Sequence, residues 1–254
     1  MKHLFFVFAS LVPLAFAQGS DLQKGDSYYE FRAENSQHNA ADNKNVKEAI
    51  KHYALALKNS SEREEAAWKL LRAYYFQGCF SMPIAKEREA FFKKAKNEGR
   101  SFWKEFPDNP QIAYWYSVNL ALWAVEAGPL IAWYDGSLGE TKKVAQMLLA
   151  MEAKDDKISA ARGSQILGRA HQKIPHVKFV LNWVKRDSAE FYYKKSMNLN
   201  PDDLATRLFL AEYYKETGKI KEAQTLRAPA LKLKPRPEEY LEDERNLTRI
   251  RELF

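Results

Sequence analysis

The sequence predicts an all-α protein built from helical hairpins, and three observations support this fold class. Apolar residues recur at helical spacing in one segment after another, without the alternation typical of strands. Breaks that contain glycine or proline separate these segments into pairs. The composition, 46% hydrophobic and 29% charged, suits amphipathic helices, which bury their apolar faces by packing against neighbours. We therefore expect residues 18–254 to form a single helical domain.

Residues 1–17 are expected to be a secretory signal peptide rather than part of that domain. Lys2 gives a basic start, residues 4–14 form an apolar run, and residues 15–17 have the A-x-A pattern of a cleavage site. The apolar run is too short to cross a bilayer as a stable helix, although an uncleaved N-terminal anchor is the alternative. Cleavage would leave Gln18 first, so the mature chain would have no N-terminal cysteine for lipid attachment.

The single cysteine, Cys79, bears on the compartment. It cannot form an internal disulfide, and an exported protein of this size without disulfides fits a bacterial periplasm. We expect Cys79 to be a small buried hydrophobic residue, with a reactive thiol as the alternative. After the signal peptide, no stretch is apolar for long enough to suggest a transmembrane helix.

The N-terminal half of the chain is expected to be helical between short breaks. Residues 22–34 and 46–58 form two helices separated by a polar stretch that reads as a loop. A helix over 62–77 follows, with glutamates in its first turn, where the helix dipole favours them. Residues 84–106 form a long helix that two prolines terminate. Residues 111–127, the most apolar segment after the signal peptide, are expected to be buried on most faces.

The C-terminal half continues in the same way after residues 128–140, which we expect to be a loop or a short turn of helix. The predicted helices of this half are 141–152, 158–171, 188–199, 204–217, 220–233 and a capping helix within 237–254. Gly218 separates the two helices of the clearest hairpin. Pro229 lies inside the second of them, which implies that this helix is kinked or short.

The hairpin over 204–233 has a spacing of small, aromatic and turn residues that matches a known repeat. The residues that carry it are Leu210, Ala211, Tyr214, Gly218, Ala223, Ala230 and Pro235. This spacing resembles the tetratricopeptide (TPR) repeat, a helical hairpin of about 34 residues. Earlier hairpins match it less closely, and Arg227 departs from it at a position where the repeat has a large apolar residue. The resemblance implies TPR-like hairpins packed as an α-solenoid or a closed bundle.

A narrower resemblance rests on residues 166–175, ILGRAHQKIP, and on a following helix that ends in MNLNPDD at 197–203. Together with long connections inside two hairpins, these features resemble the T-component (TatT-like) proteins of TRAP-type transporters. The resemblance implies hairpins around a central cavity or pore, a solute-binding subunit as protein partner, and an apolar ligand. Members of that family are often lipid-anchored through an N-terminal cysteine, whereas this chain has Gln18 at that place.

The sequence gives little support to catalysis, and we expect no enzyme activity, no cofactor and no metal site. The five histidines are scattered, without the i, i+4 spacing of a helical metal pair. Phosphate-binding loops and nucleophile motifs are absent from the sequence. The formal net charge is +7, but basic and acidic residues are interspersed, so we do not expect a nucleic-acid partner. Anionic lipid or an acidic protein face is the better match, with a solvated helical surface as the plain alternative.

Two groups of residues are candidates for binding. The aromatic group, which either lines an apolar pocket or only packs the core, is Trp115, Tyr116, Trp123, Trp133 and Tyr134. In TPR proteins a partner usually lies along the concave face formed by the first helices of the hairpins. Carried over to this sequence, that face includes Tyr29, Lys69, Phe76, Arg162, Gln165, Arg169, Lys173, Glu212 and Lys215. These positions equally suit plain exposure to solvent.

Three functions follow from these candidates. The first is an exported, non-enzymatic protein-binding subunit, an accessory component of TRAP-type solute uptake. The second is a periplasmic carrier of an apolar small molecule, which a closed cavity near Trp115, Trp123 and Trp133 would favour. The third is an envelope assembly scaffold that binds peptide, which an open groove lined by Arg169 and Lys215 would favour.

Overall fold

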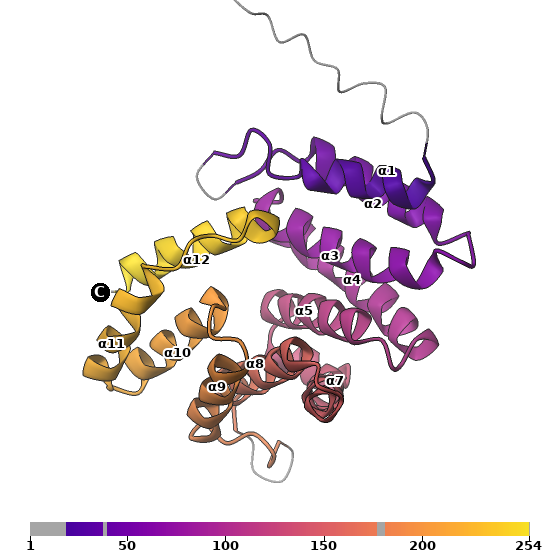
Figure 1. The fold of residues 1–254 in the computed structure, drawn as a ribbon. Coiled ribbons are helices and arrows are strands. Elements are labelled where there is room, and N and C mark those ends of the chain that lie inside the picture. Colours follow the sequence, from indigo (N-terminus) through magenta and orange to yellow (C-terminus); the bar gives the residue numbers. More distant parts are fainter. Residues whose placement is uncertain (1–18, 38–39, 177–180, 254) are drawn as a thin grey trace, which may run out of the picture.

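The computed structural model describes residues 19–37, 40–176 and 181–253, and these residues confirm the all-α fold class (Figure 1). Within them the extended structure is limited to one isolated bridge between Gln37 and Ala40. The signal peptide expected over residues 1–17 lies outside the described residues.

The helices pack as successive hairpins, formed by consecutive helices in every case but one, in which a short helix lies between the two partners. Five hairpins are formed by α1 (Asp21–Glu30) with α2 (Lys44–Ala56), α3 (Arg63–Phe80) with α4 (Ala85–Glu105), α5 (Pro110–Ala127) with α7 (Ser137–Ala150), α8 (Lys157–Lys173) with α9 (Ser188–Leu199), and α10 (Leu204–Glu216) with α11 (Ile220–Ala230). The remaining elements are α6 (Pro129–Tyr134), the 3-10 turns η1 (Met151–Lys154) and η2 (Pro237–Glu239), and α12 (Tyr240–Glu252).

Side-chain caps fix where several helices begin. Ser20 and Gln23 form a reciprocal capping box at the start of α1. The Asn109 side chain accepts hydrogen bonds of 2.9 Å from the backbone N–H groups of Gln111 and Ile112 at the start of α5. Asp156 caps α8 in the same way. These caps satisfy backbone donors that a helix leaves unpaired at its N-terminus.

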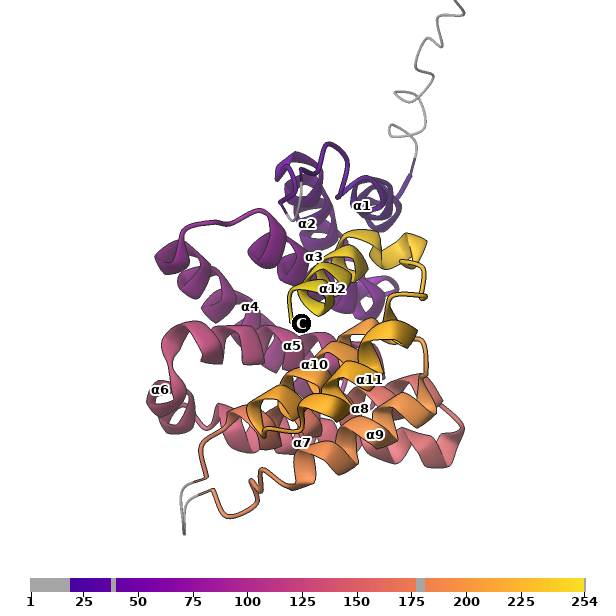
Figure 2. The ribbon, with the colours of Figure 1, turned by 90° about the vertical axis from the view of Figure 1, so that its left-hand side faces the viewer.

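The connection after α5 is more helical than the sequence suggested. Residues 129–134 form α6, and α7 begins at Ser137 rather than at residue 141. Pro129, which reads as a break, instead starts α6, because its fixed φ and missing N–H suit the first helical position. Gly136, at φ 80°, then supplies the left-handed turn between α6 and α7. Figure 2 shows α6 at the edge of the molecule.

Two hairpins are held by the same contact between a glycine and a tyrosine. A Cβ atom on Gly25 would lie 2.5 Å from the ring of Tyr53, and one on Gly168 would lie 2.7 Å from the ring of Tyr193. Both tyrosines are fully buried. A small residue is needed at both positions because the tyrosine ring of the second helix occupies the space of a side chain.

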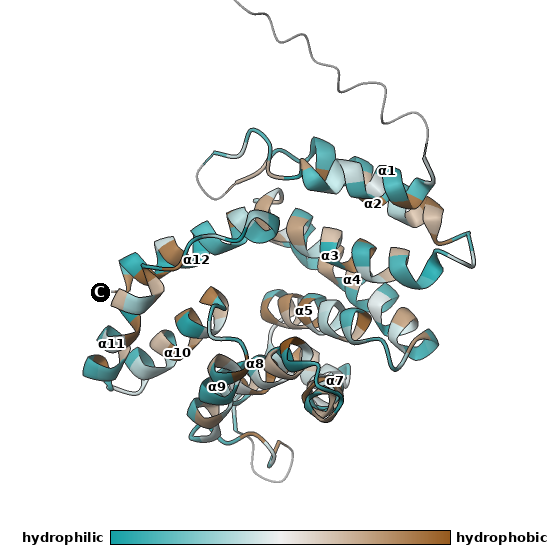
Figure 3. Ribbon diagram, in the orientation of Figure 1, coloured by the Kyte–Doolittle hydropathy of each residue, from teal (hydrophilic) through white to brown (hydrophobic). Residues whose placement is uncertain are grey.

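The core centres on α5, which packs against α3, α4 and α7. Its buried Asn119 donates hydrogen bonds to the carbonyl oxygens of Leu71 (2.9 Å) in α3 and Trp115 (2.8 Å) in α5. In Figure 3 hydrophobic residues occur along α5 and in the middle of α12, whereas α1 and the start of α12 are mostly hydrophilic. The burial expected for most faces of residues 111–127 therefore applies to the first three quarters of α5, and Val125 is exposed.

The C-terminal segment joins the two ends of the fold. The hairpins follow one another along an arc, and α12 lies between the last hairpin and α3 (Figure 1). Leu241, at the start of α12, belongs to the core of the first helices, whereas Leu247 and Ile250 pack with α10 and α11. The helix expected as a cap is present, but it bridges both ends of the arc instead of only covering the last hairpin.

Candidate functional site

A cavity of about 470 Å³ lies inside this arc. Its walls come from α3, α5, α8, the end of α9 and the segment that precedes α12. The lining residues are Trp68, Arg72, Gln111, Tyr114, Trp115, Ile158, Ala161, Arg162, Gln165, Ser196, Asn200, Asp203, Arg236, Glu238 and Glu239. Most of these side chains are polar or charged, and the volume is in the range of about 300–1,000 Å³ that is usual for ligand pockets.

Three aromatic rings form one wall of the cavity. Tyr114 and Trp115 follow each other on α5 with their ring centroids 4.9 Å apart in an edge-to-face arrangement. Trp68 of α3 adds a half-buried indole. Burial raises the pKa of Tyr114 to about 12, so its phenol is neutral at physiological pH.

Two arginines of the cavity are held by aromatic rings instead of carboxylates. The guanidinium carbon of Arg72 lies 4.1 Å from the centroid of Tyr29 and 4.9 Å from that of Trp68. That of Arg162 lies 4.2 Å from the centroid of Tyr114, and its Nη1 donates a 3.0 Å hydrogen bond to Gln111. Among the described residues, no carboxylate forms an ion pair with either arginine within 4.0 Å, and the buried Nε of Arg72 has no hydrogen-bond acceptor.

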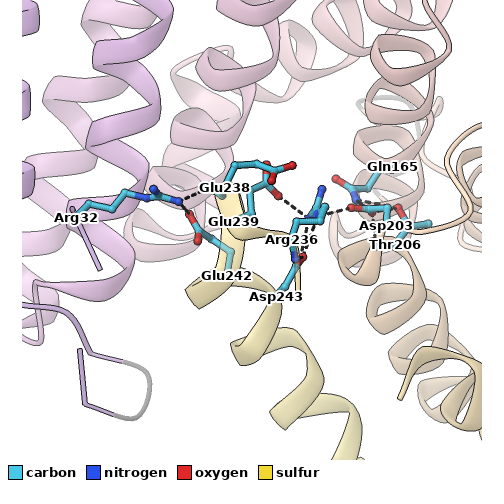
Figure 4. A network of polar contacts seen from close by, with 9 residues as sticks. All are labelled: Arg32, Gln165, Asp203, Thr206, Arg236, Glu238, Glu239, Glu242 and Asp243. Atoms are coloured by element: carbon cyan, nitrogen blue, oxygen red, sulfur yellow. Dashed lines mark hydrogen bonds and ion pairs between the residues drawn. The ribbon is translucent and has the colours of Figure 1, made fainter. Parts of the chain in front are cut away.

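The third arginine, Arg236, is fully engaged by acids (Figure 4). Its guanidinium donates hydrogen bonds of 2.8 and 2.7 Å to the two carboxylate oxygens of the buried Asp243. Glu239 is 2.5 Å away, and Asp203 is 3.9 Å away. The hydrogen bonds to Asp243 raise the pKa of Arg236 further above its ordinary value. This network fixes the segment that closes the cavity.

Asp203 is also engaged on the other side of the cavity. Its carboxylate caps α10 by accepting a 2.7 Å hydrogen bond from the backbone N–H of Thr206. The same oxygen accepts a 2.7 Å hydrogen bond from the side chain of Gln165, which comes from α8. The start of α10 is therefore tied to the cavity wall.

A second contact holds the segment before α12 against the first hairpin. Arg32 donates hydrogen bonds to the carbonyl oxygen of Glu238 and, at 3.5 Å, to the carboxylate of Glu242 (Figure 4). Burial raises the pKa of Glu242, while the attraction of Arg32 opposes this shift. Burial likewise raises the pKa of Glu239, against the attraction of Arg236. The two acids lie between Arg32 and Arg236 in Figure 4.

Three of the residues predicted for binding line the cavity, namely Trp115, Arg162 and Gln165. On α3 the sequence pointed to the wrong face. Lys69 is buried and pairs with Asp26 (2.7 Å) and Glu65 (2.6 Å), and Phe76 is fully buried, whereas Trp68 and Arg72 face the cavity. The i, i+4 spacing of Trp68 and Arg72 is the signal that could have marked this face.

The other aromatic candidates do not meet in one pocket. Tyr29, Tyr116 and Trp123 are buried in the core. Tyr116 donates a hydrogen bond to Glu140, and the ammonium of Lys96 lies 3.5 Å from the centroid of a Trp123 ring. Trp133 and Tyr134 of α6 are exposed, Tyr134 at 89%. A closed cavity among the predicted tryptophans is therefore not observed.

The remaining candidates join α8 to α10, and α10 to α12 and its C-terminal end. Arg169 pairs with Glu212 at 2.8 Å and lies over the ring of Phe209. Lys173 pairs with Glu216, and Lys215 donates a 2.7 Å hydrogen bond to the carbonyl oxygen of Leu253. Glu212 also accepts a hydrogen bond from Arg249. These side chains hold neighbouring helices together and do not line the cavity.

The described residues contain no group of three or more histidine, cysteine or acidic side chains that could hold a metal ion. None of the helices described is both long and apolar enough to cross a membrane. The half-buried thiol of Cys79 has a raised pKa, because burial disfavours the thiolate.

Comparison with protein-family models and with curated proteins gave no match to this chain. The fold and the cavity thus define the class: an all-α protein of helical hairpins with a polar, aromatic-lined cavity that the segment before its last helix borders.

Proposed function

We propose that this chain is an exported, non-enzymatic TPR-like protein that receives a segment of a partner protein in its interior cavity. We further propose that it works in a bacterial periplasm as an accessory component of TRAP-type solute uptake, with a solute-binding subunit as the partner. The observation that supports binding is the cavity itself, in which the first helices of three hairpins, α3, α5 and α8, present aromatic and polar side chains toward one space.

The chemistry of the cavity favours a polar chain segment as its occupant. A peptide carries backbone donors and acceptors in addition to side chains, and Gln111, Gln165 and Asn200 offer matching groups. The rings of Trp68, Tyr114 and Trp115 offer rigid apolar surface of the kind found at the centres of protein interfaces.

An apolar small molecule suits the cavity less well than a peptide does. Such a ligand would remove water from Arg72, Arg162 and Arg236 without giving these cations new partners. The carrier hypothesis relied on a cluster of tryptophans, of which only Trp115 lies at the cavity. The cavity therefore suits a protein partner better than an apolar ligand. A protein partner is part of two of the three functions, the transport accessory and the envelope scaffold. The resemblance at residues 166–175 and 197–203 favours the transport accessory.

The experiment is capture of partners from an envelope extract on immobilised mature protein, with native mass spectrometry of the eluate. The test variant is Gln111→Trp, which adds an indole to the cavity wall. The matched control is Gln224→Trp on the exposed surface of α11. We expect recovery of a solute-binding protein at equal stoichiometry, lost in Gln111→Trp and kept in Gln224→Trp. Recovery of the chain alone with added small-molecule mass would support the carrier instead, and equal capture by both variants would place the partner elsewhere.

A further inference from the structure

The two stacked arginines of the cavity, Arg72 and Arg162, have donors that the folded chain leaves unused. A guanidinium stacked on a ring keeps its N–H groups in the plane, where they can reach an acceptor at the edge. Arg162 uses one donor on Gln111. Arg72 makes no ion pair or hydrogen bond with the described residues, and its Nε is buried.

The acids that line the cavity do not satisfy these cations. Asp203 caps α10 and accepts a hydrogen bond from Gln165, and Glu239 forms an ion pair with Arg236. Glu238 is exposed to solvent, and no ion pair joins its carboxylate to a basic group of the described residues. Among the described residues, Arg72 and Arg162 thus form no ion pair with a carboxylate within 4.0 Å, although Glu239 attracts Arg162 from a greater distance, whereas Arg236 forms several.

From this imbalance we propose that the partner segment is acidic, and that its carboxylates pair with Arg72 and Arg162 on either side of the Tyr114–Trp115 wall. This inference rests on the proposed function, because it names the chemistry of the segment that the cavity receives. Arg72 forms no hydrogen bond with the described residues, and its buried Nε has no acceptor, so a carboxylate beside its guanidinium would supply the charge-assisted hydrogen bonds that this cation lacks. The aromatic wall between the arginines would contact the apolar parts of the same segment.

The probe is a fluorescein-labelled peptide of Glu, Gly, Ser and Tyr, measured by fluorescence anisotropy on the mature protein. Its twin has Gln in place of every Glu. We expect the Glu peptide to bind at least about tenfold more tightly than its twin, and Arg72→Gln with Arg162→Gln to weaken it by about tenfold or more. The matched control Arg251→Gln, an exposed arginine of α12, should leave the affinity unchanged. Added NaCl should weaken binding of the Glu peptide more than that of the twin.

Several results would overturn the inference. They are equal affinity for the two peptides, no binding of the Glu peptide, and equal affinity in the double variant and the wild type. Displacement of the peptide by free glutamate, mole for mole, would assign the carboxylate to a small acid and also overturn it. If circular dichroism shows that Arg72→Gln is unfolded, the inference is tested with Arg162→Gln alone and with the salt dependence of binding. If the double variant captures the envelope partner as well as the wild type does, the inference of an acidic segment is refuted, whereas the proposed function is not.

Discussion

The contact between Arg32 and Glu242 should hold the last helix in place, and replacing the arginine tests this directly. The side chains of Arg32 and Glu242 are 8% and 7% exposed, and their closest charged atoms are 3.5 Å apart. The guanidinium also lies 4.4 Å from the centroid of Tyr29. Arg32→Met keeps an unbranched apolar stem there but leaves Glu242 buried without its cation.

The expected cost is about 3 kcal/mol of unfolding free energy, the lower end of the range for breaking a buried pair, because 3.5 Å is a long contact. For a chain of this size, that loss corresponds to a fall in Tm of about 6 to 12 °C. The loss should be local first, so hydrogen exchange should accelerate in α12 before it does in α7 and α8.

The stability lost in Arg32→Met should also depend on pH, and the pKa shift of Glu242 gives the direction of this dependence. Burial raises the pKa of this acid in the folded protein, so the stability linked to its protonation is present at acid pH and is lost as pH rises through the folded pKa. Removing Arg32 removes the attraction that opposes this shift. The Tm difference between Arg32→Met and wild type should therefore be smaller at pH 5 than at pH 7.5. An unchanged Tm with full protection of α12, matching the control Arg251→Met, would refute this role for the pair.

Three further predictions concern packing, pH and exposure. Gly168→Val should destabilise the protein by about 2 kcal/mol in urea unfolding, because the new side chain meets a buried tyrosine ring, whereas Gly139→Val, in open space, should not show this overpacking cost. Burial lowers the pKa of His171 from its ordinary 6.5, so stability should fall as pH drops from 6.5 through the folded pKa, and melts of His171→Gln should show a weaker fall. Leu130→Ser with Ile131→Ser should change the unfolding free energy by less than about 0.5 kcal/mol per site, because both side chains are exposed on α6; a clear loss of Tm would mean that α6 is packed.

Local signals in the sequence were enough to find the hairpins. The segments expected over 204–217 and 220–233 appear as α10 and α11, because Asp203 caps the first and Gly218, at φ 78°, turns the chain between them. The second helix is short, as Pro229 implied: α11 ends at Ala230, one residue after the proline and three residues before the expected end at 233.

The cavity was harder to predict because it depends on contacts between distant parts of the chain. Helix α3 is buried on most of its faces, so apolar spacing could not show that Trp68 and Arg72, rather than Lys69 and Phe76, would face inward. Arg236 enters the site only because the segment before α12 returns to the first hairpin. The i, i+4 spacing of Trp68 and Arg72 is the one local sign of the first feature, and the return of the segment before α12 leaves no local pattern in the sequence.

The central claim is that a partner segment lies in the cavity, and hydrogen exchange of the mature protein with and without the captured partner tests it most directly. We expect the partner to slow exchange at residues 68–72, 111–115 and 158–165, which line three walls of the cavity, while α6 and α11 stay unchanged. Slowed exchange confined to α6, α4 or α11, with the cavity helices unaffected, would contradict the claim.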